Sequence, residues 1–228
     1  MTIQEAIIAR HSVRAYKDHA LSEETVKVLK EEIEELNKKG RLHIQLIQNE
    51  PKAFQGTLAK YGKFRNVRNY LVMAGKKSED LDERIGYYGE HLVLMAQTLG
   101  LNTCWVGLSY SKVAGTYVLA DDEKIACYIA IGYGETQGVG HKIKTVEKVS
   151  NASESSPSWF RKGVEAALLA PTAVNQQKFS FEYIGIKNNR HQVRAHKRFS
   201  LIGYSQMDLG IAKYHFEIGA DKENFDWA

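Results

Sequence analysis

The sequence predicts an α+β protein in which helices and strands alternate along the chain. Apolar residues recur at helical spacing in several segments, which is typical of amphipathic helices. Between these segments lie short alternating or wholly apolar runs, which are typical of strands. The order helix, strand, strand, helix over residues 22–99 then recurs over residues 158–219. We therefore expect an internal pseudo-duplication with a boundary in the serine-rich stretch 150–157.

The composition fits a globular protein and disfavours several classes of partner. The 228 residues are 43% hydrophobic and 25% charged, which allows a substantial core. The formal net charge is +4 with dispersed basic residues, so we expect small anions and not nucleic acid as partners. Cys104 and Cys127 lie in apolar runs without Cys-x-x-Cys spacing, which favours buried, reduced thiols. No signal peptide or membrane-spanning run is evident, so we expect a cytoplasmic protein without membrane attachment.

Helix starts and strand patterns can be assigned along both halves. Thr2 and Glu5 form a capping box that starts a short helix, and Ser22 caps a second helix that should stop at Gly40. Further helices are expected at 80–99, 158–170 and 207–219, and a helix or loop at 51–64. Strands are expected at 41–48, 69–74, 102–108, 124–131, 178–186 and 199–203. Residues 1–150 and 151–228 should form two halves of one compact unit.

The segment Arg10-His11-Ser12-Val13-Arg14 is a candidate anion site. In an extended backbone, side chains of alternate residues point to the same side, which would bring together Arg10, Ser12 and Arg14. Guanidinium groups bind phosphate or carboxylate through charge-assisted hydrogen bonds. The alternative is a solvated basic turn. Lys142 and Lys144 also share one side of an extended stretch, with solvated lysines as the alternative.

Several segments together resemble the FMN-dependent nitroreductases, most closely the branch called putative TM nitroreductases. The segments are Arg10–Arg14, Gly86–Gly107, Ile131–Gly134 with downstream Lys142 and Lys144, Ala170–Gln177 and Asp208–Ala212. They span nearly the whole chain. The resemblance implies a mixed, mainly antiparallel sheet surrounded by helices, with FMN as cofactor and NAD(P)H as transient reductant.

The sequence departs from the family pattern in the position of one motif. In ordinary members, a segment like Ala170–Gln177 follows the first motif by a few dozen residues, and each subunit lends it to the flavin of its dimer partner. Here this segment occurs only in the second half, and the Arg-x-Ser-x-Arg motif occurs only in the first. We therefore expect one flavin site between the two halves of a monomeric pseudo-dimer, or of a homodimer of such chains.

The resemblance implies roles for residues of four segments. Arg10, Ser12, Lys142 and Lys144 would hold the FMN phosphate, and Arg14 could reach the pyrimidine end of the flavin. The amides of Asn175 and Gln177 would match the flavin edge or the ribityl hydroxyls, although a polar helix cap is the alternative. Gly107 would let backbone N–H groups approach the flavin N5, although it could simply end a strand. The expected cofactor-binding residues are Arg10, His11, Ser12, Arg14, Trp105, Val106, Gly107, Leu108, Lys142, Lys144, Pro171, Thr172, Ala173, Asn175 and Gln177.

The implied activity is reduction of nitroaromatics, quinones or similar small-molecule acceptors with NAD(P)H by a ping-pong cycle. We expect the cofactor to carry the hydride chemistry, with no catalytic side chain and no metal site. The Gly-x-Gly-x-x-Gly motif is absent, which agrees with a dinucleotide that visits the site. Glu90 and His91 are expected to face solvent or cap a helix. The alternatives are a flavin-binding or sensory protein without turnover, and an anion-binding module without flavin.

Overall fold

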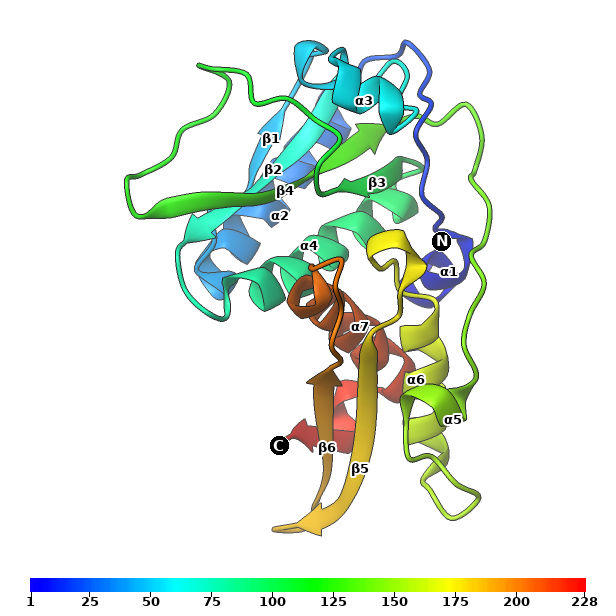
Figure 1. Cartoon of the computed structure of the whole chain (residues 1–228). Helices are drawn as coiled ribbons and strands as arrows, with labels where there is room; N and C mark the ends of the chain where they lie inside the picture. The colour runs from blue at the N-terminus through cyan, green and yellow to red at the C-terminus, as the bar shows by residue number, and fades with distance from the viewer.

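The computed structural model describes residues 1–228 and contains two sheets with helices packed between them (Figure 1). The first sheet has the order β1 (Gln45–Ile47), β2 (Asn69–Lys76), β4 (Glu123–Gly132) and β3 (Asn102–Val106). All of its neighbouring strands are antiparallel. The predicted α+β class with a mainly antiparallel arrangement and surrounding helices is therefore confirmed, although the strands form two sheets.

The second sheet is built from the last third of the chain. It pairs β5 (Phe179–Lys187) antiparallel with β6 (Arg190–Lys197), and β6 parallel with β7 (Phe225–Trp227). The strand expected at 199–203 is wrong: Asn188 and Asn189 both have positive φ angles and turn the chain back immediately, so the pairing strand comes earlier. Residues 199–203 instead form an exposed apolar loop, in which Leu201 is 92% exposed.

The helices largely agree with the expected positions. The Thr2 capping box and the Ser22 cap are both present, and Arg41 with a left-handed φ of 49° ends the second helix one residue later than expected. The helices are α1 (Ile3–Ala9), α2 (Glu23–Gly40), α3 (Thr57–Tyr61), α4 (Leu81–Thr98), α5 (Val146–Val149), α6 (Ser158–Leu168) and α7 (Ser205–Ala220). Short 3₁₀ turns lie at Lys52–Phe54, Ala173–Asn175 and Lys222–Asn224. None of these helices is both long and apolar enough to cross a membrane.

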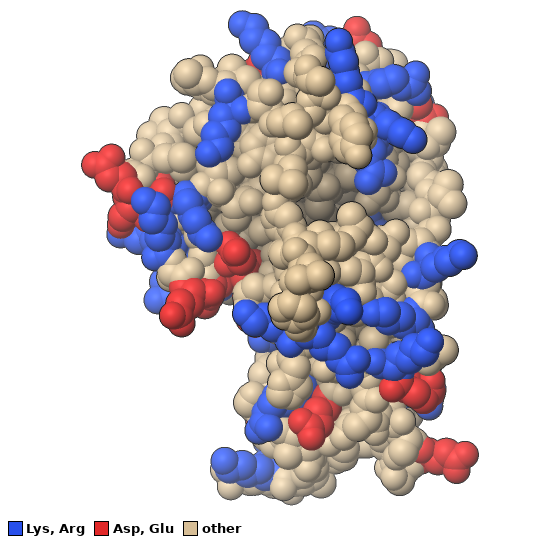
Figure 2. Space-filling model, viewed as in Figure 1, with Lys and Arg blue, Asp and Glu red and all other residues tan.

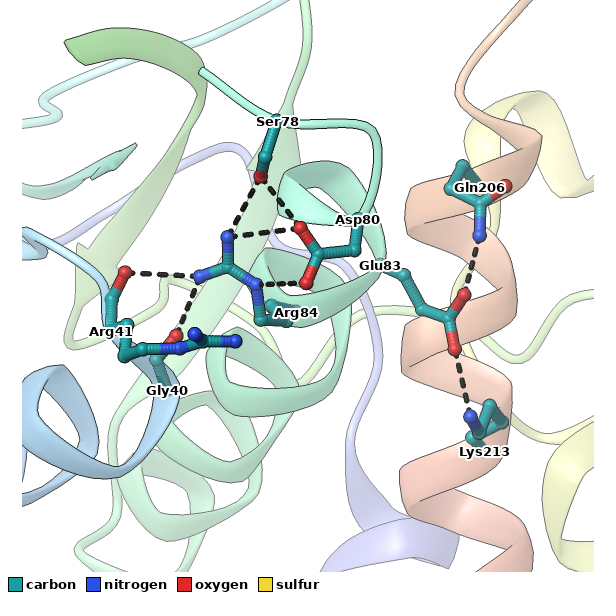
Figure 3. A network of polar contacts seen from close by, with 8 residues as sticks. All are labelled: Gly40, Arg41, Ser78, Asp80, Glu83, Arg84, Gln206 and Lys213. Carbon is teal, nitrogen blue, oxygen red and sulfur yellow. Dashed lines mark hydrogen bonds and ion pairs between the residues drawn. The ribbon is translucent and has the colours of Figure 1, made fainter. Parts of the chain in front are cut away.

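Helices α4 and α7 cross at two glycines, one from each half of the sequence. A Cβ atom on Gly86 would overlap the carbonyl oxygen of Met207, and a Cβ atom on Gly210 would overlap that of Glu83. The missing side chains therefore allow the two backbones to touch. Glu83 also accepts hydrogen bonds from Gln206 and from Lys213 Nζ, the latter at 2.7 Å (Figure 3).

An arginine of α4 connects this helix to the end of α2. Arg84 Nη1 donates to the carbonyl oxygen of Gly40 at 2.6 Å, and its Nε donates to Asp80 Oδ2 at 2.8 Å (Figure 3). Since the last carbonyls of a helix lack partners within it, the arginine satisfies one of them. This contact fixes α2 against α4 on the first sheet.

The hydrophobic core crosses the expected boundary between the halves. The largest cluster joins Leu71 and Met73 of β2 to Phe179 and Phe181 of β5 through side chains of α2, α4, α6 and α7. A second cluster lies on the other face of the first sheet, around Tyr128. Both faces of this sheet are therefore buried, which fits its apolar central strands. The internal duplication and the boundary near residue 150 stay predictions.

Candidate functional site

A cavity of about 300 Å³ lies where the two halves of the chain meet. The first half contributes the extended segment after α1, the end of β3 and one residue of β4. The second half contributes the segment after α6, the exposed loop and the first turns of α7. The lining residues are Ser12, Arg14, Trp105, Val106, Gly107, Leu108, Cys127, Pro171, Thr172, Ala173, Val174, Asn175, Ile202, Tyr204, Met207, Asp208 and Ile211. The cavity thus brings together the predicted Arg-x-Ser-x-Arg, Trp105–Leu108 and Pro171–Asn175 segments.

Backbone pairing places the wall from the first half. Ser12 forms a parallel bridge with Thr103 of β3, and the N–H of Val13 donates to the Thr103 carbonyl at 3.0 Å. This pairing aligns Ser12 with the strand that ends at Gly107. A Cβ atom on Gly107 would lie 2.6 Å from Cζ of Tyr204, so a side chain there would require this ring to move. The predicted approach of the Gly107 backbone to the flavin N5 stays a prediction.

The wall from the second half is an irregular segment with unusual backbone angles. Val174, Asn175 and Gln177 have φ angles of 46°, 55° and 45°, in the left-handed region that non-glycine residues rarely occupy. This conformation costs about 1–2 kcal/mol for each such residue. Neighbouring contacts must therefore hold the segment in place.

Asp208 supplies much of that restraint. Its carboxylate accepts the Ala173 N–H at 3.0 Å and Gln176 Nε2 at 2.7 Å. Gln176 in turn donates to the Gly203 carbonyl at 3.0 Å and accepts from the Ser200 hydroxyl. We call Asp208 and Gln176 the carboxylate clasp, because together they tie the segment after α6 to the exposed loop and to α7. Burial raises the pKa of Asp208 to about 6, although its two hydrogen bonds act in the opposite direction.

Three residues predicted to bind the cofactor lie beside the cavity and contact one another. The buried Gln177 side chain accepts the Lys144 N–H at 2.9 Å and donates to the Lys142 carbonyl at 2.8 Å. Lys144 Nζ donates to the carbonyls of Gln176 and Gln177 at 2.8 and 2.7 Å, and the Lys142 side chain is exposed. None of the three lines the cavity. Their predicted contact with the cofactor stays a prediction.

Lys144 belongs to a group of basic side chains near the rim. Partial burial, followed by the nearby charges of Lys178, Arg198 and Lys148, lowers the pKa of Lys144. None of these four residues forms an ion pair with a carboxylate, as the ion pairs of the chain lie elsewhere. The group therefore carries positive charge without a compensating anion.

Arg10 lies in a buried polar cluster behind the cavity wall. Its side chain is 3% exposed, and its Nε lies 3.9 Å from Glu90 Oε1 without a hydrogen-bond partner. Glu90 accepts Trp105 Nε1 and His215 Nε2, each at 2.8 Å. The expectation that Glu90 faces solvent or caps a helix is wrong, because it points from the middle of α4 into this cluster. Burial lowers the pKa of Arg10, while Glu90 opposes that shift.

His215 of α7 completes this cluster from the second half of the chain. Its Nε2 faces Glu90 Oε1 at 2.8 Å, and its Nδ1 faces the Ala166 carbonyl at 3.1 Å. The cluster of Arg10, Glu90 and His215 therefore connects α4 to α7 behind Trp105.

His11 lies beside the cavity and not in its lining. A Cβ atom on Gly138 would lie 2.8 Å from the His11 Cβ, so the two segments are in close contact. Partial burial and the charge of Arg10 lower the pKa of His11. The predicted contacts of Arg10 and His11 with the cofactor, like those of the two lysines, stay predictions.

Seven lining residues were not expected from sequence, and most come from apolar stretches. They are Cys127, Val174, Ile202, Tyr204, Met207, Asp208 and Ile211. Cys127 was expected to be buried and reduced, and both cysteines are indeed buried and free. Val174, Asp208 and Ile211 lie within the segments that resemble family motifs, and Asp208 also stands out as a lone carboxylate within the apolar stretch Met207–Ala212.

Comparisons with known proteins identify the family and show a similar fold. A model of the family described as putative TM nitroreductase matches residues 2–220. The fold is similar to that of a putative nitroreductase from Thermotoga maritima, with 23% identity, a TM-score of 0.65, and coverage of 98% of this chain and 85% of that one. It is also similar to a putative nitroreductase from Desulfovibrio desulfuricans in complex with FMN. That comparison gives 18% identity, a TM-score of 0.53, and coverage of 69% of this chain and 99% of that one. No curated protein matches the sequence.

Proposed function

Because the chain belongs to the putative TM nitroreductase family, we propose that it is an FMN-dependent oxidoreductase. In this proposal it reduces nitroaromatics, quinones or similar acceptors with NAD(P)H in a ping-pong cycle. The observation that carries the proposal is the cavity in which Ser12 and Arg14 meet Pro171–Asn175 beside Gly107. These are the segments whose sequences resemble flavin-binding motifs, and they come together from opposite halves of the chain.

The chemistry of the surrounding groups fits a bound phosphate ester. Arg10 Nε is buried without a hydrogen-bond partner, and the basic group around Lys144 has no compensating carboxylate. The basic group leaves positive charge available to an anion, and Arg14 lies exposed in the lining. Phosphate contacts with such groups are charge-assisted and worth about 1.5–3 kcal/mol each. We propose that Ser12, Arg14 and Lys144 hold FMN, with Arg10 contributing its charge from behind.

The size and polarity of the cavity fit the planar ring of a cofactor. Its volume of about 300 Å³ lies at the lower end of the range for small-molecule sites. Met207 and Ile211 form an apolar floor, and the exposed side chains of Leu108, Val174 and Ile202 form an apolar rim. These residues would exclude water from the ring of a bound flavin. FMN itself supplies the capacity to accept a hydride and pass electrons to an acceptor.

The placement of the cavity supports one flavin per chain. Its lining combines the only Arg-x-Ser-x-Arg motif with the only segment like Ala170–Gln177. A second equivalent site would need a second copy of each. We therefore propose a single site shared by the two halves, whether the chain is a monomer or a homodimer. A flavin content near two per chain would contradict this arrangement.

The experiment that tests the proposed function is flavin uptake followed by anaerobic reduction. Purified protein is mixed with FMN, freed of unbound flavin, and titrated with NADPH or NADH while flavin absorbance is recorded. We expect about one FMN per chain, bleaching by at least one dinucleotide, and recovery of colour on adding a quinone. A protein that takes up no FMN would refute the proposal, and one that binds FMN but is not bleached would be a flavin-binding protein without turnover.

A further inference from the structure

A second hollow of about 400 Å³ opens directly beside the cavity. The two spaces share Arg14, Trp105, Val106 and Gly107 as a common wall. The opposite wall of the second hollow comes from the last residue of α3 and the three residues after it, with Ser109 closing one side. Its lining residues are Arg14, Tyr61, Gly62, Lys63, Phe64, Trp105, Val106, Gly107 and Ser109. We call this space the α3 hollow; a molecule whose reacting part lies near Gly107 could extend into it.

The charged groups of the α3 hollow are both cationic and unpaired. Arg14 and Lys63 line it, no carboxylate does, and neither residue forms an ion pair. Other arginines close in sequence differ, since Arg65 pairs with Glu135 and Arg68 with Asp18. Lysine and arginine side chains gather around the hollowed part of the face shown in Figure 2. The α3 hollow therefore offers the unpaired positive charge of Lys63 to a ligand, next to the Arg14 guanidinium that is proposed to hold FMN.

Aromatic rings accompany these charges. Phe64 is buried and presents its ring to Arg14, whose Cζ lies 6.0 Å from the ring centroid. Tyr61 is 88% exposed, so its ring is available to stack on a ligand. A planar ring with an anionic substituent would match both features, because rings stack on aromatic side chains and anions bind guanidinium and ammonium groups.

Backbone contacts fix the residues that carry these groups. The N–H of Lys63 donates to the Lys60 carbonyl at 2.9 Å, and that of Phe64 donates to the Ala59 carbonyl at 3.0 Å. The N–H of Arg65 then donates to the Arg14 carbonyl at 2.9 Å, which ties the two walls together. The distance between the two cationic segments is therefore set by the fold.

We propose that the α3 hollow binds the anionic substituent of an aromatic electron acceptor, so that the site prefers carboxylated or sulfonated nitroaromatics and quinones over neutral ones. This inference rests on the proposed function and adds the substrate class. For a quinone, the overall step transfers a hydride from NAD(P)H and takes one proton from solvent. The quinone becomes the hydroquinone and NAD(P)⁺ leaves.

The test compares a neutral acceptor with its charged analogue in variants of one lysine. FMN-loaded protein is assayed with nitrobenzene and with para-nitrobenzoate for the wild type, Lys63→Gln and Lys63→Glu. For Lys63→Gln we expect the KM for para-nitrobenzoate to rise about fivefold at low salt, with a further rise for Lys63→Glu and little change for nitrobenzene. The effect should shrink as salt screens the exposed charge. The matched control is Lys30→Gln, which removes an exposed lysine of α2 far from the cavity.

Three readouts separate the possible outcomes. FMN affinity, measured by flavin fluorescence, should be the same in all variants, since Lys63 does not line the cavity. The KM for NADPH is measured alongside that for N-benzyl-dihydronicotinamide, a hydride donor without phosphates. If Lys63→Gln raises the KM for NADPH but not for para-nitrobenzoate, the hollow serves the phosphates of the reductant and the proposal is overturned. Equal changes for the two acceptors would also overturn it, and a wild type that takes up no FMN would overturn the proposed function as well.

Discussion

The two walls of the cavity are held in different ways. The wall from the first half is positioned by backbone pairing, through the bridge between Ser12 and Thr103 and the strand that ends at Gly107. The wall from the second half lies in an irregular segment with left-handed residues, held by the side chains of Asp208 and Gln176. The first wall should therefore resist changes of individual lining side chains, whereas the second should depend on a single titratable carboxylate.

The buried cluster of Arg10, Glu90 and His215 is the exception to this contrast, because it supports the first wall through side chains. In the variant Glu90→Gln, the cluster loses its only anion while Arg10 and His215 remain buried beside it. Removing one partner of a buried ion pair typically costs about 3–5 kcal/mol. We expect the free energy of unfolding in urea to fall by about this amount, the largest effect among these predictions.

The matched control for this variant is Glu135→Gln. Glu135 pairs with Arg65 at the surface, where such pairs contribute about 0–1 kcal/mol. If the two variants lost equal stability, the buried cluster would not support the first wall. A shift in Trp105 fluorescence should accompany Glu90→Gln alone, since Glu90 accepts the indole N–H.

The pH dependence of Asp208 tests how strongly the second wall depends on the carboxylate clasp. The folded-state pKa of about 6 lies above the ordinary value of 3.8, so the folded protein holds this proton more tightly than the unfolded chain does. The stability from this group is therefore fully present below about pH 4 and is lost as pH rises through about 6. From the size of the pKa difference, the contribution of Asp208 to the free energy of unfolding should change by about 2–3 kcal/mol.

This change is measured as the difference in unfolding free energy between the wild type and Asp208→Asn at several pH values. Because asparagine does not titrate, the difference should fall as pH rises from 4 to 7 and then level off. Asp226→Asn is the matched control, since Asp226 forms an exposed pair with Arg190. A difference independent of pH would show that Asp208 titrates as an ordinary surface carboxylate.

The crossing of α4 and α7 connects the helix that carries Glu90 to the helix that carries Asp208. The variant Gly210→Ala tests the close packing of the two helices. Helix propensity alone predicts that alanine stabilises a helix by about 0.5–1 kcal/mol. The added Cβ would instead overlap the Glu83 carbonyl, and such overpacking typically costs about 1–3 kcal/mol. We expect a net loss of stability on thermal unfolding. Gly140→Ala is the control, because a Cβ there meets its nearest atom at an ordinary 3.5 Å.

The smallest expected effect distinguishes the two lysines beside the second wall. Lys144→Ala removes the ammonium group proposed to hold FMN together with its hydrogen bonds to the carbonyls of Gln176 and Gln177, and should weaken FMN binding by about 1.5 kcal/mol. Lys142→Ala removes only an exposed side chain, because Gln177 bonds to the Lys142 backbone carbonyl. Its effect should stay below about 0.5 kcal/mol. Fluorescence titration with FMN measures both, and equal losses would indicate that both ammonium groups contact the cofactor directly.

The sequence was most informative where local patterns determine structure. The caps at Thr2 and Ser22, the strands of the first sheet and the long helices follow from spacing and hydrogen-bonding chemistry. The strand expected at 199–203 failed because its apolar residues resemble a buried strand, whereas they form the exposed loop next to the cavity. Exposed apolar residues near a binding site follow the same pattern as core residues, so hydrophobicity alone could not separate them.

For the site, the sequence motifs identified segments that line the cavity, but they did not identify the partners of individual side chains. Ser12, Arg14 and Gly107 line the cavity, while Arg10 lies behind the wall, and their contacts with a cofactor stay predictions. Alternation along an extended chain could not reveal the buried carboxylate of Glu90, which is 80 residues away in sequence. The role of Asp208 likewise depends on a contact between distant segments. Contacts of this kind are set by the tertiary fold.

The glycine crossing has a consequence for the ancestry of the chain. Gly86 faces Met207 and Ile211, while Gly210 faces Glu83 and Tyr87, so exchanging the two helices maps one set of contacts onto the other. Reciprocal contacts of this kind characterise the interface of a twofold dimer. This is the arrangement expected from the predicted internal duplication, with the crossing as the internal equivalent of a dimer interface. In a duplicated chain each half can change without altering an identical twin, which would allow the Arg-x-Ser-x-Arg motif and the Ala170–Gln177 segment to occur once each.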